Sequence, residues 1–214
     1  MGIGFAPTWL RQVNPPASQN HFNHCSRTVS SCFAVLRQLR SIRRSVSPAV
    51  LQSLVVSLVL SRLDYGNATL AGLPRNQLDG LQSVMNAAAW LVCSARKYKH
   101  ITPLLRALHW LPVHERIEFK LAVLIFRCLH GTAPPYLAKK LCHVADIDAR
   151  RRLRSASTSA LITPSSHRST IGDRAFFVTA PCIWNSLPST VTASETLGIF
   201  KCRLKTHLFA ASLN

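Results

Sequence analysis

The sequence predicts a mainly α-helical protein: an irregular helical bundle with a short strand- and loop-rich C-terminal section and a final helix. Two observations predict this class. Apolar residues recur at the i, i+3, i+4 spacing of an amphipathic helix through most of residues 27–145, and helix start and stop signals separate these runs. Hydrophobic residues make up 48% of the 214 residues, which is enough to build a core and excludes wholesale disorder.

The first 63 residues predict an irregular start and then two helices. Residues 1–26 contain several prolines and no sustained period, so they are predicted to be irregular. A helix follows from Thr28 with the apolar face Val29, Cys32, Phe33, Leu36, Leu39 and Ile42. Ser47 and Pro48 supply an N-cap hydroxyl and a proline at the first helical position, which predicts a second helix to about Leu63. Its predicted inward residues are Val50, Leu51, Leu54, Val55, Leu58 and Val59.

The middle of the chain predicts three more helices. The first covers about residues 76–94, with the inward residues Leu78, Leu81, Met85, Ala88, Leu91 and Val92. A short helix begins at the pair Thr102-Pro103, and Leu111-Pro112 then interrupts the pattern. The long helix that follows covers about residues 113–130, and Gly131 stands where a C-terminal cap glycine belongs. Its predicted inward residues are Ile117, Leu121, Leu124, Ile125 and Leu129.

The C-terminal third has a different character. A short helix begins near Pro134-Pro135, residues 146–154 form a charged loop, and residues 155–173 are rich in Ser and Thr, which favours short strands or loops. An aromatic cluster follows, formed by Phe176, Phe177 and Trp184. A last helix covers about residues 195–209, with Leu197, Phe200, Leu204 and Leu208 on one face. We therefore divide the chain into an irregular N-terminus (1–26), a helical region (27–145) and a basic C-terminal region (146–214).

The charge balance predicts a polyanionic partner. The chain has 26 Lys and Arg against 8 Asp and Glu, a formal net charge of +18. The excess falls into four clusters, and guanidinium groups suit phosphate because their forked donors match its oxygens. We predict nonspecific binding of RNA or DNA; the alternative is a set of solvated faces that bind nothing in particular. The predicted phosphate contacts are Arg37, Arg40, Arg44, Lys97, Lys99, Arg151, Arg152, Lys201 and Lys205.

The sequence contains no motif for covalent catalysis or nucleotide hydrolysis. It lacks a G-x-S-x-G elbow, a P-loop and a G-x-G-x-x-G fingerprint. The acid pairs Glu115/Glu118 and Asp146/Asp148 are interleaved with or followed by basic residues, which favours salt-linked, solvated segments over acid–base or metal chemistry. We therefore predict that the chain is not an enzyme and has no catalytic residue, cofactor or small-molecule substrate.

The densest set of potential metal ligands is His21, His24, Cys25 and Cys32. This set is too compact for the two separated ligand pairs of a zinc finger, so we predict exposed histidines and no metal site. The seven cysteines are odd in number and irregularly spaced, which favours buried thiols in a reducing compartment over a disulfide framework. No apolar run reaches the length of a membrane span, and none is predicted.

The acid-free N-terminal segment leaves the location open between two alternatives. We expect the nucleus or the cytoplasm. The first acid is Asp64, and the preceding residues 1–63 are rich in Arg and Ser, which is also the composition of a mitochondrial transit peptide. Mitochondrial import is therefore the alternative.

A family resemblance rests on motifs that occur in a fixed order. In the first two thirds they are Ser61–Asn67, Ala71–Pro74, Leu81–Ala89, His100–Pro103, Leu108–Val113, Arg116–Leu121 and Leu129–Leu137. In the last third they are Leu153–Ser155, Gly172–Phe176, Ala180–Pro188, Phe200–Lys201 and Leu204–Phe209. Over about residues 27–213, the chain resembles the C-terminal, thumb-side segment of LINE-type non-LTR retrotransposon reverse transcriptases of the jockey-like group.

The resemblance implies a non-catalytic fragment of such an enzyme. The family's polymerase palm carries an aromatic-x-Asp-Asp metal site that this sequence lacks, and the endonuclease is absent too. The segment that matches is expected to help hold template RNA and target DNA. Gly66 stands where the family usually has Cys, Trp90 stands where it has a basic residue, and residues 1–26 do not match. These departures fit a decayed or captured copy; the alternative is an expressed relic with no selected function.

Overall fold

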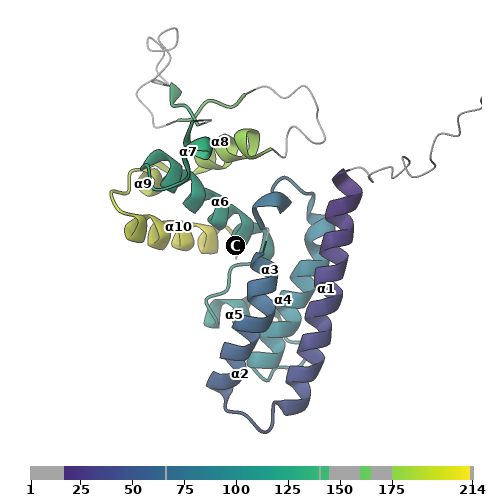
Figure 1. Cartoon of the computed structure of the whole chain (residues 1–214). Helices are drawn as coiled ribbons and strands as arrows, with labels where there is room; N and C mark the ends of the chain where they lie inside the picture. Colours follow the sequence, from purple (N-terminus) through teal and green to yellow (C-terminus); the bar gives the residue numbers. More distant parts are fainter. Residues whose placement is uncertain (1–16, 66, 140, 145–159, 165–174, 213–214) are drawn as a thin grey trace, which may run out of the picture.

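The computed structural model describes residues 17–65, 67–139, 141–144, 160–164 and 175–212. These residues are mainly helical, which confirms the predicted fold class (Figure 1). The helices form two groups, an elongated N-terminal lobe (described residues 17–121) and a smaller C-terminal lobe (described residues 122–212) at one end of it. Among these residues, no helix is both long and apolar enough to cross a membrane.

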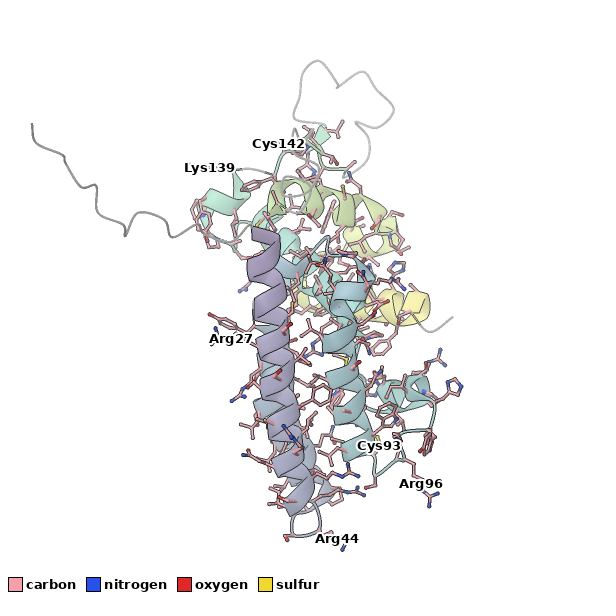
Figure 2. All side chains as sticks on the ribbon, turned by 90° about the vertical axis from the view of Figure 1, so that its right-hand side faces the viewer. Arg27, Arg44, Cys93, Arg96, Lys139 and Cys142 are labelled. Atoms are coloured by element: carbon pink, nitrogen blue, oxygen red, sulfur yellow. The ribbon has the colours of Figure 1, made fainter. Side chains whose placement is uncertain are left out.

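The longest helix, α1 (Ala17–Ile42), packs along α4 (Arg75–Val92) in both views (Figures 1 and 2). Cys32, Leu36 and Leu39 are buried as predicted, whereas Ile42 at the helix end is 41% exposed. The prediction that residues 17–26 are irregular is wrong, because α1 already begins at Ala17. No proline or glycine lies between Pro16 and Ile42. A helix that forms around the apolar residues from Val29 onward can therefore extend back through the polar residues before it at little cost in free energy.

The second predicted helix consists of α2 (Pro48–Val55), a π-helical turn η2 (Val56–Leu60) and α3 (Ser61–Asp64). The Val50 amide donates to the Ser47 hydroxyl at 3.4 Å, which confirms the predicted N-cap. The predicted inward face is only partly correct, because Val50 and Leu58 are exposed. Leu58 lies within the π-helical turn, which holds more residues than an α-helical turn and so departs from the predicted α-helical spacing. Val50 lies before it, in the first turn of α2. The buried residues are Leu51, Val55, Val59, Leu60 and Leu63.

A short 3₁₀ turn, η3 (Asn67–Leu70), leads to α4, and α5 (Ile101–Ala107) follows α4. The predicted inward residues of α4 are buried except for Val92, which is partly buried. The helix α5 begins at Ile101, so Thr102 is not its N-cap, and Pro103 falls within the first turn, where its missing N–H is not needed. The chain leaves both helices through residues with positive φ, Ser94 (55°) and His109 (54°).

The helix α6 (Val113–Leu129) joins the two lobes because it contributes to two cores. Its first half places Ile117 and Leu121 in the N-terminal core, and its second half places Ile125 in the C-terminal core. The Val113 amide donates to the Gln82 side-chain carbonyl of α4 at 2.8 Å, which caps the helix from outside. Of the predicted inward residues, Leu124 and Leu129 are only half-buried.

Gly131 ends α6 as predicted. Its φ is 69°, a left-handed conformation that glycine adopts without the Cβ penalty. The Thr132 amide donates to the Arg127 carbonyl at 2.9 Å, and the Gly131 amide donates to the Cys128 carbonyl at 3.3 Å. This pair of hydrogen bonds is the Schellman pattern of a glycine-terminated helix.

The C-terminal lobe contains α7 (Pro135–Ala138), α8 (Phe176–Ser186), α9 (Ser189–Thr192) and α10 (Leu197–Ser212). Its core is built around Phe200, whose ring centroid lies 4.5 Å from that of Phe126 and 5.8 Å from that of Trp184. Phe200, Leu204 and Leu208 are buried as predicted for the last helix, and Leu197 is partly buried. Phe176 and Phe177 of the predicted cluster contact each other edge to face, at 5.8 Å.

Of residues 155–173, which were predicted to form short strands or loops, 155–159 and 165–173 lie outside the described residues, as does the predicted charged loop 146–154. The described residues contain no strand, and one isolated antiparallel bridge joins His143 to Leu161. The side chain of Asn185 holds this segment against α8. Its amide nitrogen donates to the Leu161 carbonyl and its amide oxygen accepts from the Leu161 amide, both at 2.9 Å. One side-chain amide therefore supplies both hydrogen bonds that a neighbouring strand would give.

Candidate nucleic-acid interface

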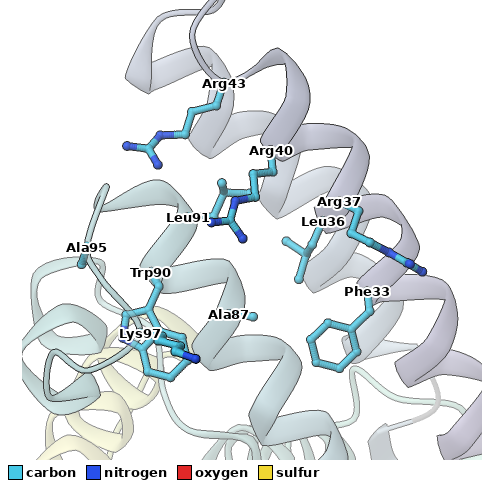
Figure 3. Close-up of a pocket in the computed structure, with 10 residues that line it drawn as sticks. All are labelled: Phe33, Leu36, Arg37, Arg40, Arg43, Ala87, Trp90, Leu91, Ala95 and Lys97. Carbon is cyan, nitrogen blue, oxygen red and sulfur yellow. The ribbon is translucent and has the colours of Figure 1, made fainter.

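A cavity of about 330 Å³ lies between α1 and α4, at the part of the N-terminal lobe remote from the C-terminal lobe. Its walls are apolar and its rim is basic, and none of the described residues that line it is acidic. Figure 3 shows the full set of lining residues, which are Phe33, Leu36, Arg37, Arg40, Arg43, Ala87, Trp90, Leu91, Ala95 and Lys97. The site combines cations with an aromatic and aliphatic surface.

The C-terminal end of α1 and the turn that follows it supply three guanidinium groups to the rim. Arg37 and Arg40 lie three residues apart on α1, so they share one side of the helix, and Arg43 follows in the turn after it. Arg40 and Arg43 extend toward α4, whereas Arg37 points away from the centre of the cavity (Figure 3). Arg37 and Arg40 are exposed and Arg43 is half-buried. The charges of Arg40 and Arg43 are therefore available to a ligand that enters the cavity from solvent.

The wall of the cavity opposite α1 is formed by the end of α4 and the turn that follows it. The Trp90 indole nitrogen donates to the Lys99 carbonyl at 3.1 Å, and this hydrogen bond fixes the ring at the cavity wall. The Ala95 amide donates to the Trp90 carbonyl at 3.0 Å across the left-handed residue Ser94. This turn places Ala95 and Lys97 on the rim, facing α1. The turn therefore sets both the ring and the cation opposite α1.

The structure brings together some of the predicted phosphate contacts. Arg37, Arg40 and Lys97 come from two separate sequence clusters and line the same cavity. Arg44 lies in the turn beyond α1 and is exposed, and the exposed Lys99 contributes its carbonyl to the Trp90 hydrogen bond (Figure 2). Neither is among the lining residues. Arg151 and Arg152 lie outside the described residues.

Lys201 and Lys205 belong to a different surface, on α10 of the C-terminal lobe. The Lys205 ammonium lies 5.8 Å from the centroid of the Phe209 ring, and Arg203 of the same helix donates to the Thr190 carbonyl at 2.9 Å. Arg203 and Lys205 of α10 thus take part in contacts within their own lobe. The predicted contacts that the structure describes therefore lie on two separate surfaces, one on each lobe.

Two residues of the site, Arg43 and Trp90, are not among the contacts predicted from the sequence. Arg43 lies in the same arginine-rich segment as Arg40 and Arg44, so its three-residue spacing from Arg40 was the available signal. Trp90 is separated from these arginines by about fifty residues, and only the packing of α4 on α1 places it opposite them. Its position follows from tertiary structure and from no local pattern.

Two acids among the described residues, Asp64 and Glu118, form contacts away from this cavity. Asp64, at the end of α3, forms a two-point ion pair with the Arg116 guanidinium, and the Lys120 ammonium lies 3.4 Å from the same carboxylate. The Asp64 and Arg116 side chains are each only 20% exposed, so the pair is partly protected from water. It ties the end of α3 to α6.

Glu115 and Glu118, the acid pair on α6, are close enough for the Glu115 carboxylate to affect the pKa of Glu118. Burial raises the pKa of Glu118, the Glu115 carboxylate raises it further, and His114, Arg75 and His207 act in the opposite direction. The His114 ring nitrogen lies 3.5 Å from Glu118, which agrees with the predicted salt-linked face. Glu118 is 35% exposed, so the predicted full solvation of this face is only partly correct.

Within the described ranges, no group of three or more His, Cys, Asp or Glu residues is placed to hold a metal ion. Cys25 and Cys32 are buried on α1, and burial raises the pKa of both thiols. The side chains of His21 and His24 lie outside the described ones.

Comparison with known proteins identified no family for the chain. No protein family model matches it, no curated protein is similar to it, and no solved structure matches it.

Proposed function

We propose that this chain is a non-catalytic remnant of a LINE-type reverse transcriptase that binds RNA or DNA nonspecifically through phosphate contacts. The observation that carries the proposal is that Arg37, Arg40 and Lys97, from two separate sequence clusters, line one cavity that has no acidic residue among its described lining residues. The formal net charge of +18 and the ordered motifs of the sequence support it. Nucleus or cytoplasm is the proposed location.

Counterion release gives this proposal a quantitative signature. Each phosphate neutralised by a Lys or Arg releases condensed counterions, so log affinity falls with log salt by about 0.7 per contact on a single strand. We expect a steep negative slope for the wild-type protein in a gel-shift titration across salt. A flat slope, or no binding at low salt, would overturn the proposal.

A pair of double variants tests the location of the contacts. Arg37→Gln with Arg40→Gln should weaken binding and reduce the magnitude of the salt slope by roughly 1.4, because two contacts are lost. The matched control is Arg127→Gln with Lys139→Gln, which removes two exposed charges from the C-terminal lobe. Equal losses in both variants would indicate that net charge alone governs binding, and that the cavity rim has no special role.

A further inference from the structure

The cavity between α1 and α4 has two kinds of surface that bear on its ligand. The rings of Phe33 and Trp90 and the side chains of Leu36, Ala87 and Leu91 form an apolar wall. The Arg40 and Arg43 guanidinium groups and the Lys97 ammonium lie at its rim (Figure 3). A bare phosphate would use the rim and leave the wall uncovered, and a neutral apolar ligand would leave the cations unused. The ligand that satisfies both surfaces has a flat apolar ring joined to an anion.

We infer that this cavity binds one unpaired base of a single-stranded nucleic acid, with the base against Trp90 and the adjoining phosphates at Arg40, Arg43 and Lys97. This inference rests on the proposed function and deepens it. Aromatic side chains stack on bases of any sequence, and a positively charged groove follows the backbone on either side. The cavity volume of about 330 Å³ falls within the range of small-ligand sites, so a single ring can enter.

The Trp90 ring is held in place before any ligand arrives. Its indole nitrogen is bonded to the Lys99 carbonyl, so the ring cannot rotate freely, and it packs against the N-terminal core. Two backbone hydrogen bonds, from the Ala95 amide to the Trp90 carbonyl and from the Lys99 amide to the Arg96 carbonyl, hold the backbone on either side of Lys97 near the same ring. The Lys97 ammonium lies 5.2 Å from the centroid of the Tyr98 ring. A preorganised ring costs less conformational entropy on binding than a mobile one.

The same geometry favours single strands over duplexes. In a duplex the bases are paired and stacked, so no base face is free to enter a cavity between two helices, and only the rim could contact phosphates. A single strand presents both the phosphates and a free base. The wall therefore adds a contact that duplex binding lacks.

The experiment compares two single strands with equal phosphate charge: a short oligothymidylate and an abasic strand of the same length. Fluorescence anisotropy with labelled strands should give about 5- to 150-fold tighter binding of the oligothymidylate, the range expected for one base–aromatic stack. A duplex of the same length should lack this gain. Because the abasic strand keeps every phosphate, the ratio of the two affinities isolates the contribution of the base.

Two variants that change the structure in different ways test whether the apolar wall of the cavity binds the base. Trp90→Leu removes the ring, and Ala87→Met fills the cavity while Trp90 stays in place; both should bring the affinity ratio close to one. Tyr136→Leu is the control, since Tyr136 is a 69% exposed aromatic residue on α7. It should keep the wild-type ratio. Far-UV circular dichroism verifies that each variant folds.

The outcomes separate this inference from the proposed function. Equal affinity for the two single strands, with a steep salt slope, would overturn the base site and leave the phosphate-binding proposal intact. No binding of either strand at low salt would overturn both. If thymidine monophosphate displaced the strand as effectively as unlabelled oligothymidylate did, the cavity would be a site for a free nucleotide, and the inference of a strand would be wrong.

Discussion

The hydrophobic cores of the two lobes are built from different kinds of side chain. The N-terminal core consists mostly of aliphatic residues from helices whose apolar faces repeat along the sequence, such as Leu81 and Met85 of α4. The C-terminal core is organised by three stacked rings, Phe126, Trp184 and Phe200, from three different helices. Aliphatic residues distribute the buried apolar surface over many positions, whereas three stacked rings place much of it at a few positions. The lobes should therefore differ in how much one substitution costs.

The largest effect is expected for Phe200→Ala. Phe200 is fully buried and contacts both other rings, so its removal leaves a cavity that the lobe cannot fill. Large-to-small changes of this kind cost about 3–5 kcal/mol of unfolding free energy. Urea unfolding monitored by far-UV circular dichroism measures the loss.

The matched change in the N-terminal core is Met85→Ala, which removes another fully buried side chain. We expect a smaller loss, nearer the lower end of the about 2–5 kcal/mol range for aliphatic truncations. Both variants should unfold in one transition, because α6 belongs to both cores. Two separate transitions in Phe200→Ala would contradict this and would identify the lobes as independent folding units.

The same difference explains which parts of the fold could be predicted from sequence. Helices of the N-terminal lobe follow from periodic apolar residues and from caps such as Ser47 and Gly131, whose chemistry is local. The exposure of Leu58 could not be predicted, because it depends on a π-helical turn that no residue type signals. The stack of Trp184 on Phe200 could not be predicted either, because it depends on how α8 and α10 meet.

An intermediate effect is expected for Asp64→Asn, which breaks the link between α3 and α6. The change leaves Arg116 and Lys120 without their shared carboxylate. Charged hydrogen bonds contribute about 1.5–3 kcal/mol, and partial exposure places this pair near the lower value. The control Asp79→Asn removes the same charge from an exposed site on α4. Equal unfolding free energies for the two variants would show that the ion pair adds no net stability.

Only part of the candidate site could be predicted from the sequence. The arginines of α1 stand out by charge and spacing, so Arg37 and Arg40 were identified from sequence alone. Trp90 lies on a helix whose periodic residues point into the core, and its half-buried ring resembles any other core aromatic until α1 is placed opposite it. Charge is visible in a sequence, whereas a cavity exists only after two helices have packed.

The smallest effects concern the helix ends, where the lobes again differ. The left-handed position after α6 is occupied by Gly131, and those after α4 and α5 are occupied by Ser94 and His109. A Cβ added at Gly131 would meet nothing within 4 Å, so Gly131→Ala should cost only the left-handed penalty of about 1 kcal/mol. Ser94→Gly should give a gain of similar size, because it removes that penalty. Urea midpoints measure both changes.

Gly198→Ala is the control for these helix-end substitutions. Gly198 lies in α10 without a positive φ, and a Cβ there also meets nothing within 4 Å. The same Gly→Ala change should therefore stabilise the protein, by about 0.5–1 kcal/mol, because alanine is the better helix former. Opposite signs at Gly131 and Gly198 would assign the cost at Gly131 to its backbone angle. A gain at both positions would mean that the turn after α6 relaxes out of the left-handed region, and the Schellman hydrogen bonds would then contribute little to the end of α6.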